Sequence, residues 1–229
     1  MRIVPAALML GALTCAAYGQ LTASQIVANS LKARGGAAAF ASVHTFHFQG
    51  HLEIGGTNAP LEVWGAEGPA RIRVEVTLPT GKLTQGYDGT TAWEIDPGQT
   101  GARVLSGAEA NHVKDQALGF LDLLSAPGNS VELLGQGEMD GHSYYKLGVT
   151  VHATGDGFVQ YVDSTTWLAF HEEYPGGIEE ISDYRKVSGL LLPFHYVSGP
   201  PGEAGTPLVR ETMELDPAIA AAEFQQPKS

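Results

Sequence analysis

The sequence predicts an α+β, mainly β fold: a strongly curved antiparallel sheet that forms an incomplete (half) β-barrel, with helices covering its concave face. Three observations predict it. Segments in which apolar and polar residues alternate recur along most of the chain. Hairpin turns such as Asp88-Gly89 and Asp140-Gly141 separate these segments. Two further segments, near residues 22–34 and 106–118, begin with the capping residues of helices.

Residues 1–19 have the pattern of a secretory signal peptide. Arg2 supplies the positive charge at its start, residues 3–17 are apolar and uncharged, and Ala17-Tyr18-Gly19 places small residues at the cleavage positions. The apolar run is shorter than the about 20 residues that a helix needs to cross a bilayer. We therefore expect export to the periplasm and one mature domain over residues 20–229, acting as a monomer.

Cys15 is the only cysteine, and cleavage after Gly19 removes it. The mature domain then has no disulfide, no thiolate nucleophile and no cysteine metal ligand. The alternative is a domain anchored to a membrane through a lipidated Cys15, although Ala12-Leu13-Thr14 before it fits a lipoprotein signal poorly. A formal net charge of −12 argues against nucleic acid as a partner, and a lipid would be bound through its apolar part or a local basic site.

Two helices are predicted from their capping residues. Thr22 and Gln25 form a capping box at the start of the first helix, which ends at Gly35-Gly36. Ser106 and Glu109 form the corresponding box of the second helix. The tail over residues 216–224 is predicted to form a short helix.

Thirteen strands are predicted, and the clearest covers residues 71–78. Ile72, Val74 and Val76 alternate there with polar residues, as in a strand with one face on a core and the other in water. Residues 143–153 alternate in the same way. The other predicted strands cover residues 44–54, 60–66, 82–87, 91–95, 102–105, 131–136, 157–163, 167–174, 177–185, 191–197 and 207–214.

No residue pattern predicts a catalytic or metal site. His44, His47 and His51 lie in a predicted strand, where alternation turns His44 away and leaves the other two about 13 Å apart. Because ligands of one zinc ion must all lie within about 2 Å of it, we expect surface histidines, no metal and no cofactor. A lipase-type nucleophile elbow, a phosphate-binding loop and a dinucleotide glycine pattern are all lacking from the sequence.

The acidic residues leave one enzymatic alternative open. Glu172-Glu173 and Glu179-Glu180 occupy neighbouring predicted strands, and two carboxylates about 5–9 Å apart can hydrolyse glycosidic bonds. In an acidic chain such runs usually form the solvated face of a strand, so we expect a non-enzymatic protein. A hydrolase of envelope glycans or lipids would instead require two of these acids to converge in a cleft.

Aromatic side chains are the candidate ligand-binding residues. As a set beneath covering helices they are expected to line an apolar cavity, in which a polar group would orient the ligand. The alternative for each one is an ordinary place in the core. The candidates are Trp64, Tyr87, Trp93, Tyr145, Tyr161, Trp167 and Phe170.

Several segments together resemble the periplasmic lipoprotein carriers of the LolA/LolB type and the broader set of outer-membrane lipoprotein-sorting-protein-like domains. Each is a common helix end, hairpin or turn, and their order along nearly the whole mature chain carries the resemblance. The segments are residues 32–36, 85–97, 161–168 and 182–194 and the closing Phe224-Gln225-Gln226-Pro227.

The resemblance implies an incomplete β-barrel whose apolar cavity takes the acyl chains of lipids or lipoproteins. It further implies a periplasmic carrier without catalysis, with inner- or outer-membrane proteins as possible partners. A second alternative is an envelope sensor or scaffold that binds a protein on its sheet edge or convex face. That alternative requires a filled core and an exposed apolar patch.

Overall fold

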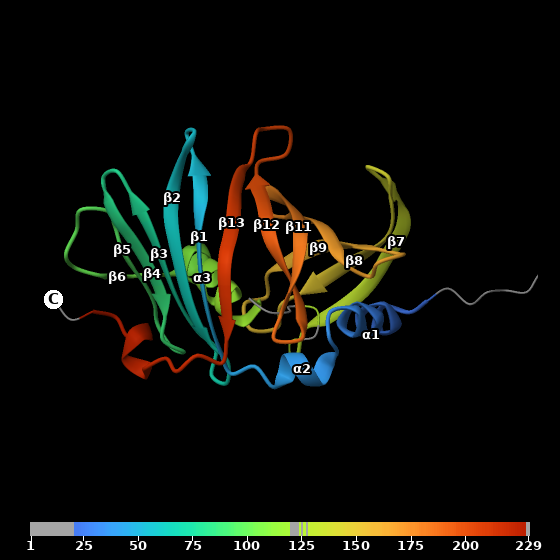
Figure 1. The fold of residues 1–229 in the computed structure, drawn as a ribbon, viewed down its shortest axis with the longest axis horizontal. Coiled ribbons are helices and arrows are strands. Elements are labelled where there is room, and N and C mark those ends of the chain that lie inside the picture. Colours follow the sequence, from blue (N-terminus) through green and yellow to red (C-terminus); the bar gives the residue numbers. More distant parts are fainter. Residues whose placement is uncertain (1–20, 120–123, 125, 127, 228–229) are drawn as a thin grey trace, which may run out of the picture.

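One antiparallel sheet of thirteen strands dominates the computed structural model, which describes residues 21–119, 124, 126 and 128–227 (Figure 1). The strand order is β6-β5-β4-β3-β2-β1-β13-β12-β11-β10-β9-β8-β7. Two meanders of consecutive strands therefore meet where β1 pairs with β13. The sheet does not close into a barrel, and this confirms the predicted mainly β, half-barrel fold class. The predicted signal peptide and Cys15 lie outside the described residues.

The first meander forms one half of the sheet. Its strands are β1 (Thr45–Ile54), β2 (Thr57–Ala66), β3 (Arg71–Leu78), β4 (Gly81–Tyr87), β5 (Ala92–Ile95) and β6 (Arg103–Val104). The second meander forms the other half. Its strands are β7 (Ser130–Met139), β8 (His142–Thr150), β9 (Gly157–Asp163), β10 (Ala169–Tyr174), β11 (Gly177–Val187), β12 (Leu190–Gly199) and β13 (Thr206–Leu215).

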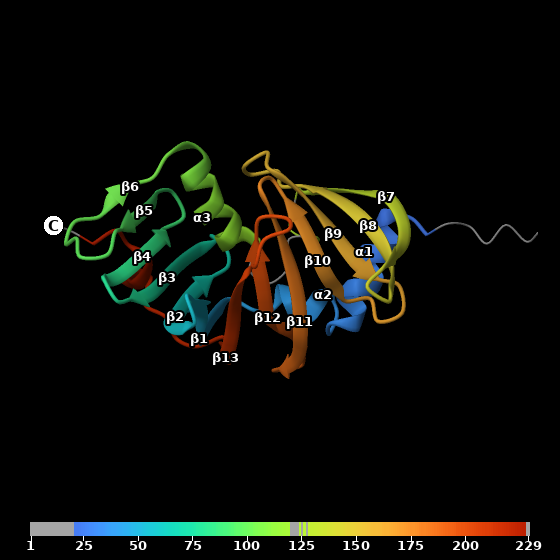
Figure 2. The same ribbon diagram turned by 90° about the horizontal axis from the view of Figure 1, so that it is seen from above.

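The helices lie at the ends and inside the curve of this sheet. Helix α1 (Ala23–Ala33) begins at the predicted Thr22–Gln25 capping box, and both reciprocal hydrogen bonds of the box are present. The short α2 (Ala37–Ala41) follows it, and α3 (Gly107–Gly119) lies within the curve between the two meanders (Figure 2). The chain closes with a 3₁₀ turn, η1 (Ala221–Phe224). No described helix has the length and apolar character needed to cross a membrane.

Each predicted strand overlaps an observed one, and small differences have local causes. The strand predicted at residues 143–153 ends at Thr150, where the chain turns through residues 152–154. The prediction also lacked α2, a single turn in an Ala-rich segment that gives no amphipathic pattern. Gly36 at the start of α2 adopts a φ of 97°, which favours glycine.

Two apolar regions cover much of the inner face of the sheet. The first apolar region joins Val113 of α3 to Phe46, Phe48 and Val63 on β1 and β2. The second apolar region joins Ile26 of α1 to Leu147 and Val149 on β8 and Val162 on β9. Because side chains alternate along a strand, these residues define the inner face of each strand, and their sequence neighbours point to the outer face.

Candidate functional site

A row of polar side chains crosses the inner face between the two apolar regions. The strand register places Leu147 of β8 opposite Gln160 of β9, and Gln160 opposite Glu172 of β10. Glu172 in turn lies opposite Glu179 of β11, and Glu179 lies opposite Ser198 of β12. Because directly opposed residues project from the same face, the row begins in the second apolar region and continues as a polar stripe.

The two carboxylates of this row each accept a hydrogen bond. The Gln160 amide donates to Glu172 at 2.5 Å, and the Ser198 hydroxyl donates to Glu179 at 2.5 Å. Burial and the neighbouring negative charge of Glu179 raise the pKa of Glu172 to about 7, although the Gln160 hydrogen bond and the charge of Arg34 act in the opposite direction. Burial likewise raises the pKa of Glu179, against the Ser198 hydrogen bond and the charge of Arg210.

Two arginines lie beside the acids and are themselves buried. Arg210 of β13 is 6% exposed, donates to the Pro193 carbonyl at 2.9 Å and lies over the rings of Phe48 and Tyr196. Arg34, the C-cap of α1, is 9% exposed and lies over the Phe40 ring. The stems and planes of both guanidinium groups thus rest on apolar or aromatic surface, while their charge acts on the acids.

Two tyrosines complete the group. The Tyr184 hydroxyl donates to the Ala169 carbonyl at 2.8 Å, and burial raises the pKa of Tyr184. Burial raises the pKa of Tyr196 to about 12, so both phenols are neutral hydrogen-bond donors near neutral pH. We call the following set the inner polar cluster: Arg34, Gln160, Glu172, Glu179, Tyr184, Tyr196, Ser198 and Arg210.

The second apolar region is only partly covered. Its centre at Ile26, Leu147 and Val162 is fully buried, but the apolar side chains around that centre keep part of their surface in contact with solvent. These partly exposed side chains include Val131 and Leu133 of β7, Tyr145 of β8, Phe158 of β9 and Trp167. An apolar inner surface beside a charged cluster suits a ligand with an apolar chain and a polar head.

Three of the seven predicted aromatic residues lie on the inner face. Tyr145 and Trp167 pack against the second apolar region, and their rings stack with centroids 5.6 Å apart. Trp167 has a φ of 63°, in a turn where the Asp163 carboxylate accepts from the backbone N–H groups of Thr165 and Thr166. Tyr87 packs against the first apolar region.

The other four aromatic residues lie on the outer face, so the seven do not gather around one cavity. Tyr161 and Phe170 belong to an outer aromatic cluster. In it, the centroid of the Tyr161 ring lies 4.8 Å from that of Tyr144 and 5.0 Å from that of His171. Trp64 stacks on His47 with ring centroids 5.3 Å apart. Trp93 is fully buried, and its indole N–H donates to the Phe224 carbonyl at 3.2 Å.

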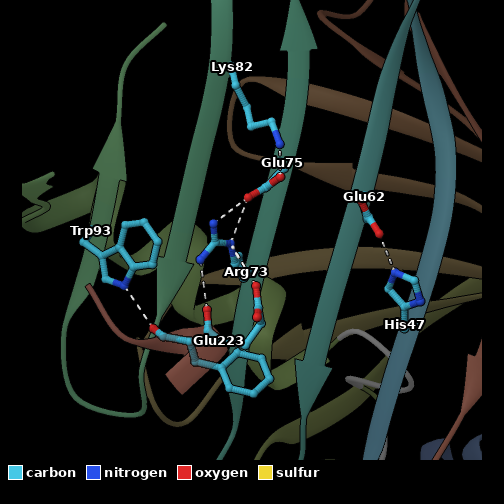
Figure 3. A network of polar contacts seen from close by, with 8 residues as sticks. His47, Glu62, Arg73, Glu75, Lys82, Trp93 and Glu223 are labelled. Carbon is cyan, nitrogen blue, oxygen red and sulfur yellow. Dashed lines mark hydrogen bonds and ion pairs between the residues drawn. The ribbon is translucent and has the colours of Figure 1, made fainter. Parts of the chain in front are cut away.

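The C-terminal segment explains why Trp93 is buried on the outer face. Figure 3 shows η1 beside Trp93 and Arg73, with Arg73 between Glu75 and the Glu223 backbone carbonyl. Lys82 pairs with the same Glu75, and His47 pairs with Glu62 on the neighbouring strands (Figure 3). This network holds the tail against the sheet and leaves the inner face to the groups described above.

The four glutamates of β10 and β11 are divided between the two faces of the sheet, whereas we expected all of them on a solvated face. Glu173 and Glu180 lie on the outer face as expected: Glu173 accepts from the Tyr161 hydroxyl at 2.7 Å, and Glu180 pairs with His171. The expectation of a solvated strand face is wrong for Glu172 and Glu179, which point inward. The physical reason is alternation, because two consecutive residues of a strand cannot share a face.

Sequence reasoning also missed the inner positions of Arg210, Tyr184 and Tyr196. One signal was available for the acids: the turn Tyr174-Pro175-Gly176-Gly177 fixes a register that sets Glu172 opposite Glu179. For Arg210 the bulge between Gln49 and Gly50 shifts the register, and no local pattern predicts it. Within the described part of the chain, no group of three or more His, Cys, Asp or Glu side chains is placed to hold a metal ion.

Comparison with known proteins identifies the fold. No protein-family model matches the sequence, and no curated protein sequence does. A DUF1329 family protein from Desulfovibrio piger shares the structure with a TM-score of 0.64 and 15% identity over 89% of this chain and 97% of the other. A LolA superfamily protein from Nitrosomonas europaea shares it with a TM-score of 0.62 and 15% identity over 90% and 98%. This chain therefore has a LolA-like fold.

Proposed function

We propose that this protein is a non-catalytic periplasmic carrier that holds the acyl chain of a lipid or lipoprotein against the inner face of β7–β9. One observation carries the proposal: partly exposed apolar side chains continue the second apolar region to solvent and end at the inner polar cluster. Each methylene group that leaves water contributes about 0.8 kcal/mol, so even a short contact with an acyl chain is favourable. The LolA-like fold supports the same function by resemblance.

Neighbouring leucines of β7 provide a matched test. Leu133 packs against the second apolar region, whereas Leu134 is 47% exposed beside a bulge in the same strand. We expect Leu133→Glu to weaken uptake of a fluorescent fatty acid at least tenfold, because a carboxylate would lie in the acyl contact. Leu134→Glu should leave uptake unchanged. Equal effects of the two substitutions, or no uptake by the unaltered protein, would exclude this binding surface.

Native mass spectrometry of protein purified from a periplasmic extract tests the carrier function directly. A bound lipid that dissociates at higher collision energy is the expected result. Protein that is empty in this measurement and also takes up no fluorescent fatty acid would contradict the proposal.

Export and maturation are part of the same proposal. A chain cleaved after Gly19 begins at Gln20, and its intact mass distinguishes it from a chain acylated at Cys15. The first mass is expected in the soluble periplasmic fraction. If the chain in the membrane fraction has the mass of the form acylated at Cys15, the protein is an anchored acceptor and the proposal of a soluble carrier is wrong.

A second candidate, hydrolysis of envelope glycans or lipids, is favoured by the inward orientation of Glu172 and Glu179. Hydrolysis by two carboxylates requires one ionised and one protonated group near neutral pH. Burial raises the pKa of both acids, and the pKa of about 7 at Glu172 suits the protonated member of such a pair. Product release from peptidoglycan or phospholipid that is abolished by Glu172→Gln would support this candidate over the carrier.

A further inference from the structure

We propose that the inner polar cluster binds the head group of a zwitterionic phospholipid, with the primary ammonium at Glu172 and Glu179 and the phosphate at Arg34 and Arg210. This inference rests on the proposed function and names the class of cargo. It goes beyond acyl-chain binding, because an apolar surface alone cannot distinguish lipids that differ only in their heads.

The acid pair has the geometry of an ammonium site. Glu172 and Glu179 are directly opposed on adjacent strands, so their carboxylates share one face at a close cross-strand position. Like charges in such a position repel each other, and a cation between them removes that repulsion. Gln160 and Ser198 each satisfy one oxygen of the pair, which leaves further acceptor capacity on both carboxylates.

The arginines lie toward the end of the sheet at which β11 turns into β12. On β12, the Leu191 N–H donates to the Arg34 carbonyl, the Pro193 carbonyl accepts from Arg210, and Ser198 lies opposite Glu179. Along β12, starting from the β11–β12 turn, the two arginines are therefore reached first and the two glutamates after them. A phospholipid head has the same order, with the phosphate next to the glycerol and the ammonium beyond it.

Charge balance favours a zwitterion over other heads. The cluster contains two acids and two arginines, so a head with one phosphate and one ammonium leaves the sum of charges in this partly buried region unchanged. An anionic head with no ammonium would bring a second source of negative charge toward Glu172 and Glu179. The neutral phenol of Tyr196 adds a hydrogen-bond donor for a phosphate or ester oxygen.

The experiment compares two phospholipids with the same fluorescent acyl chain. One is phosphatidylethanolamine with its amine free, and the other is phosphatidylglycerol, and each is titrated with the full mature protein. We expect about tenfold tighter binding of phosphatidylethanolamine, the ratio that corresponds to about 1.4 kcal/mol. Equal affinities, or tighter binding of phosphatidylglycerol, would overturn the inference.

Isosteric variants assign the preference to the acids. The double variant Glu172→Gln with Glu179→Gln is expected to bind the two phospholipids within twofold of each other, and urea denaturation checks that it is folded. The outer-face variant Glu173→Gln with Glu180→Gln is the control and should keep the tenfold preference. A preference that survives in the inner double variant would overturn the assignment.

The fatty acid separates the two levels of the proposal. If the protein takes up the fatty acid but binds the two phospholipids equally, the proposed carrier function stands and the head-group site is excluded. No binding of any of the three probes excludes both.

Discussion

Glu172 and Glu179 face each other across β10 and β11 on the inner side of the sheet, although each is followed by a glutamate that points to solvent. This arrangement places two half-buried carboxylates on the inner face beside the second apolar region. Its energetic consequence depends on pH.

The free energy of unfolding should fall as the pH rises from 5 to 8. Folding raises the pKa of Glu172 from 4.5 to about 7, so the folded protein binds this proton more tightly than the unfolded chain. The resulting stability is complete below pH 4.5 and is lost as the pH rises through 7. We expect a loss of about 1–2 kcal/mol, reduced from the full value because the side chain keeps partial exposure.

Urea denaturation at several pH values measures this loss, and Glu172→Gln should remove most of it. Glu173→Gln is the control, because the Tyr161 hydroxyl and Lys146 lower the pKa of Glu173 and its contribution changes only at more acidic pH. A Glu172→Gln variant with the same pH profile as the unaltered protein would contradict the prediction.

Removing the Phe224 side chain should destabilise the fold without affecting ligand uptake. Phe224 is 1% exposed, its ring lies under Arg71, and its carbonyl accepts from Trp93. Truncation of a buried phenylalanine costs about 3–5 kcal/mol. We expect Phe224→Ala to lose stability in that range in urea denaturation, with fatty-acid uptake unchanged at low denaturant. Glu223→Gln, at a more exposed position of the same turn, should change stability by less than about 0.5 kcal/mol.

The turn that carries Trp167 should depend on Asp163. Burial by itself would raise the pKa of Asp163, but hydrogen bonds from Thr166, Thr165 and His142 lower it to about 2. Its contribution to stability is therefore present above pH 3.8 and is lost as the pH falls toward 2. Asp163→Ala should cost about 1–3 kcal/mol at pH 7 and weaken lipid uptake, because Trp167 loses the turn that orients it.

The relevant measurement is the stability of the Asp163→Ala variant at pH 7 and at pH 2.5. The difference from the unaltered protein should shrink at the lower pH. Thr165→Ala keeps the backbone N–H that Asp163 binds and serves as the control, with an expected change of less than about 0.5 kcal/mol.

Gly65 should tolerate no side chain. A Cβ atom on Gly65 would lie 1.9 Å from the Phe46 ring, and Phe46 is fully buried in the first apolar region. Overpacking of this kind costs about 1–3 kcal/mol or more. Gly65→Ala should lower the melting temperature clearly, whereas Gly135→Ala, which would meet no atom within 4 Å, should not. Equal melting temperatures would mean that Phe46 can move aside.

The sequence was sufficient to place the strands but not to distribute all side chains between the faces. Residues 71–78 alternate so regularly that Ile72 and Val74 could be assigned to the core and Arg73 to the other face, and the structure places them there. In β10, both consecutive glutamates are polar, so neither can be assigned inward by hydropathy. Only the register with β11 decides which of the two points inward.

The aromatic residues show a second limit of local patterns. Trp93 has the hydropathy of a core residue, and it is buried, but on the outer face. The C-terminal segment that buries it lies 131 positions further along the chain, and no pattern within β5 predicts that contact. Tyr145 and Trp167, in contrast, lie close in sequence to the hairpins of the second meander, whose register brings them together.

The pairing of β1 with β13 has a consequence for how the chain folds. Within each meander only strands that follow one another are paired, and such local hairpins close quickly. Residues 46–52 of β1 pair instead with residues 208–215 of β13. The strand pair at the centre of the sheet therefore joins the residues that are farthest apart in the sequence. We therefore expect the two halves to form independently and the pairing of β1 with β13 to be the late, slow step of folding.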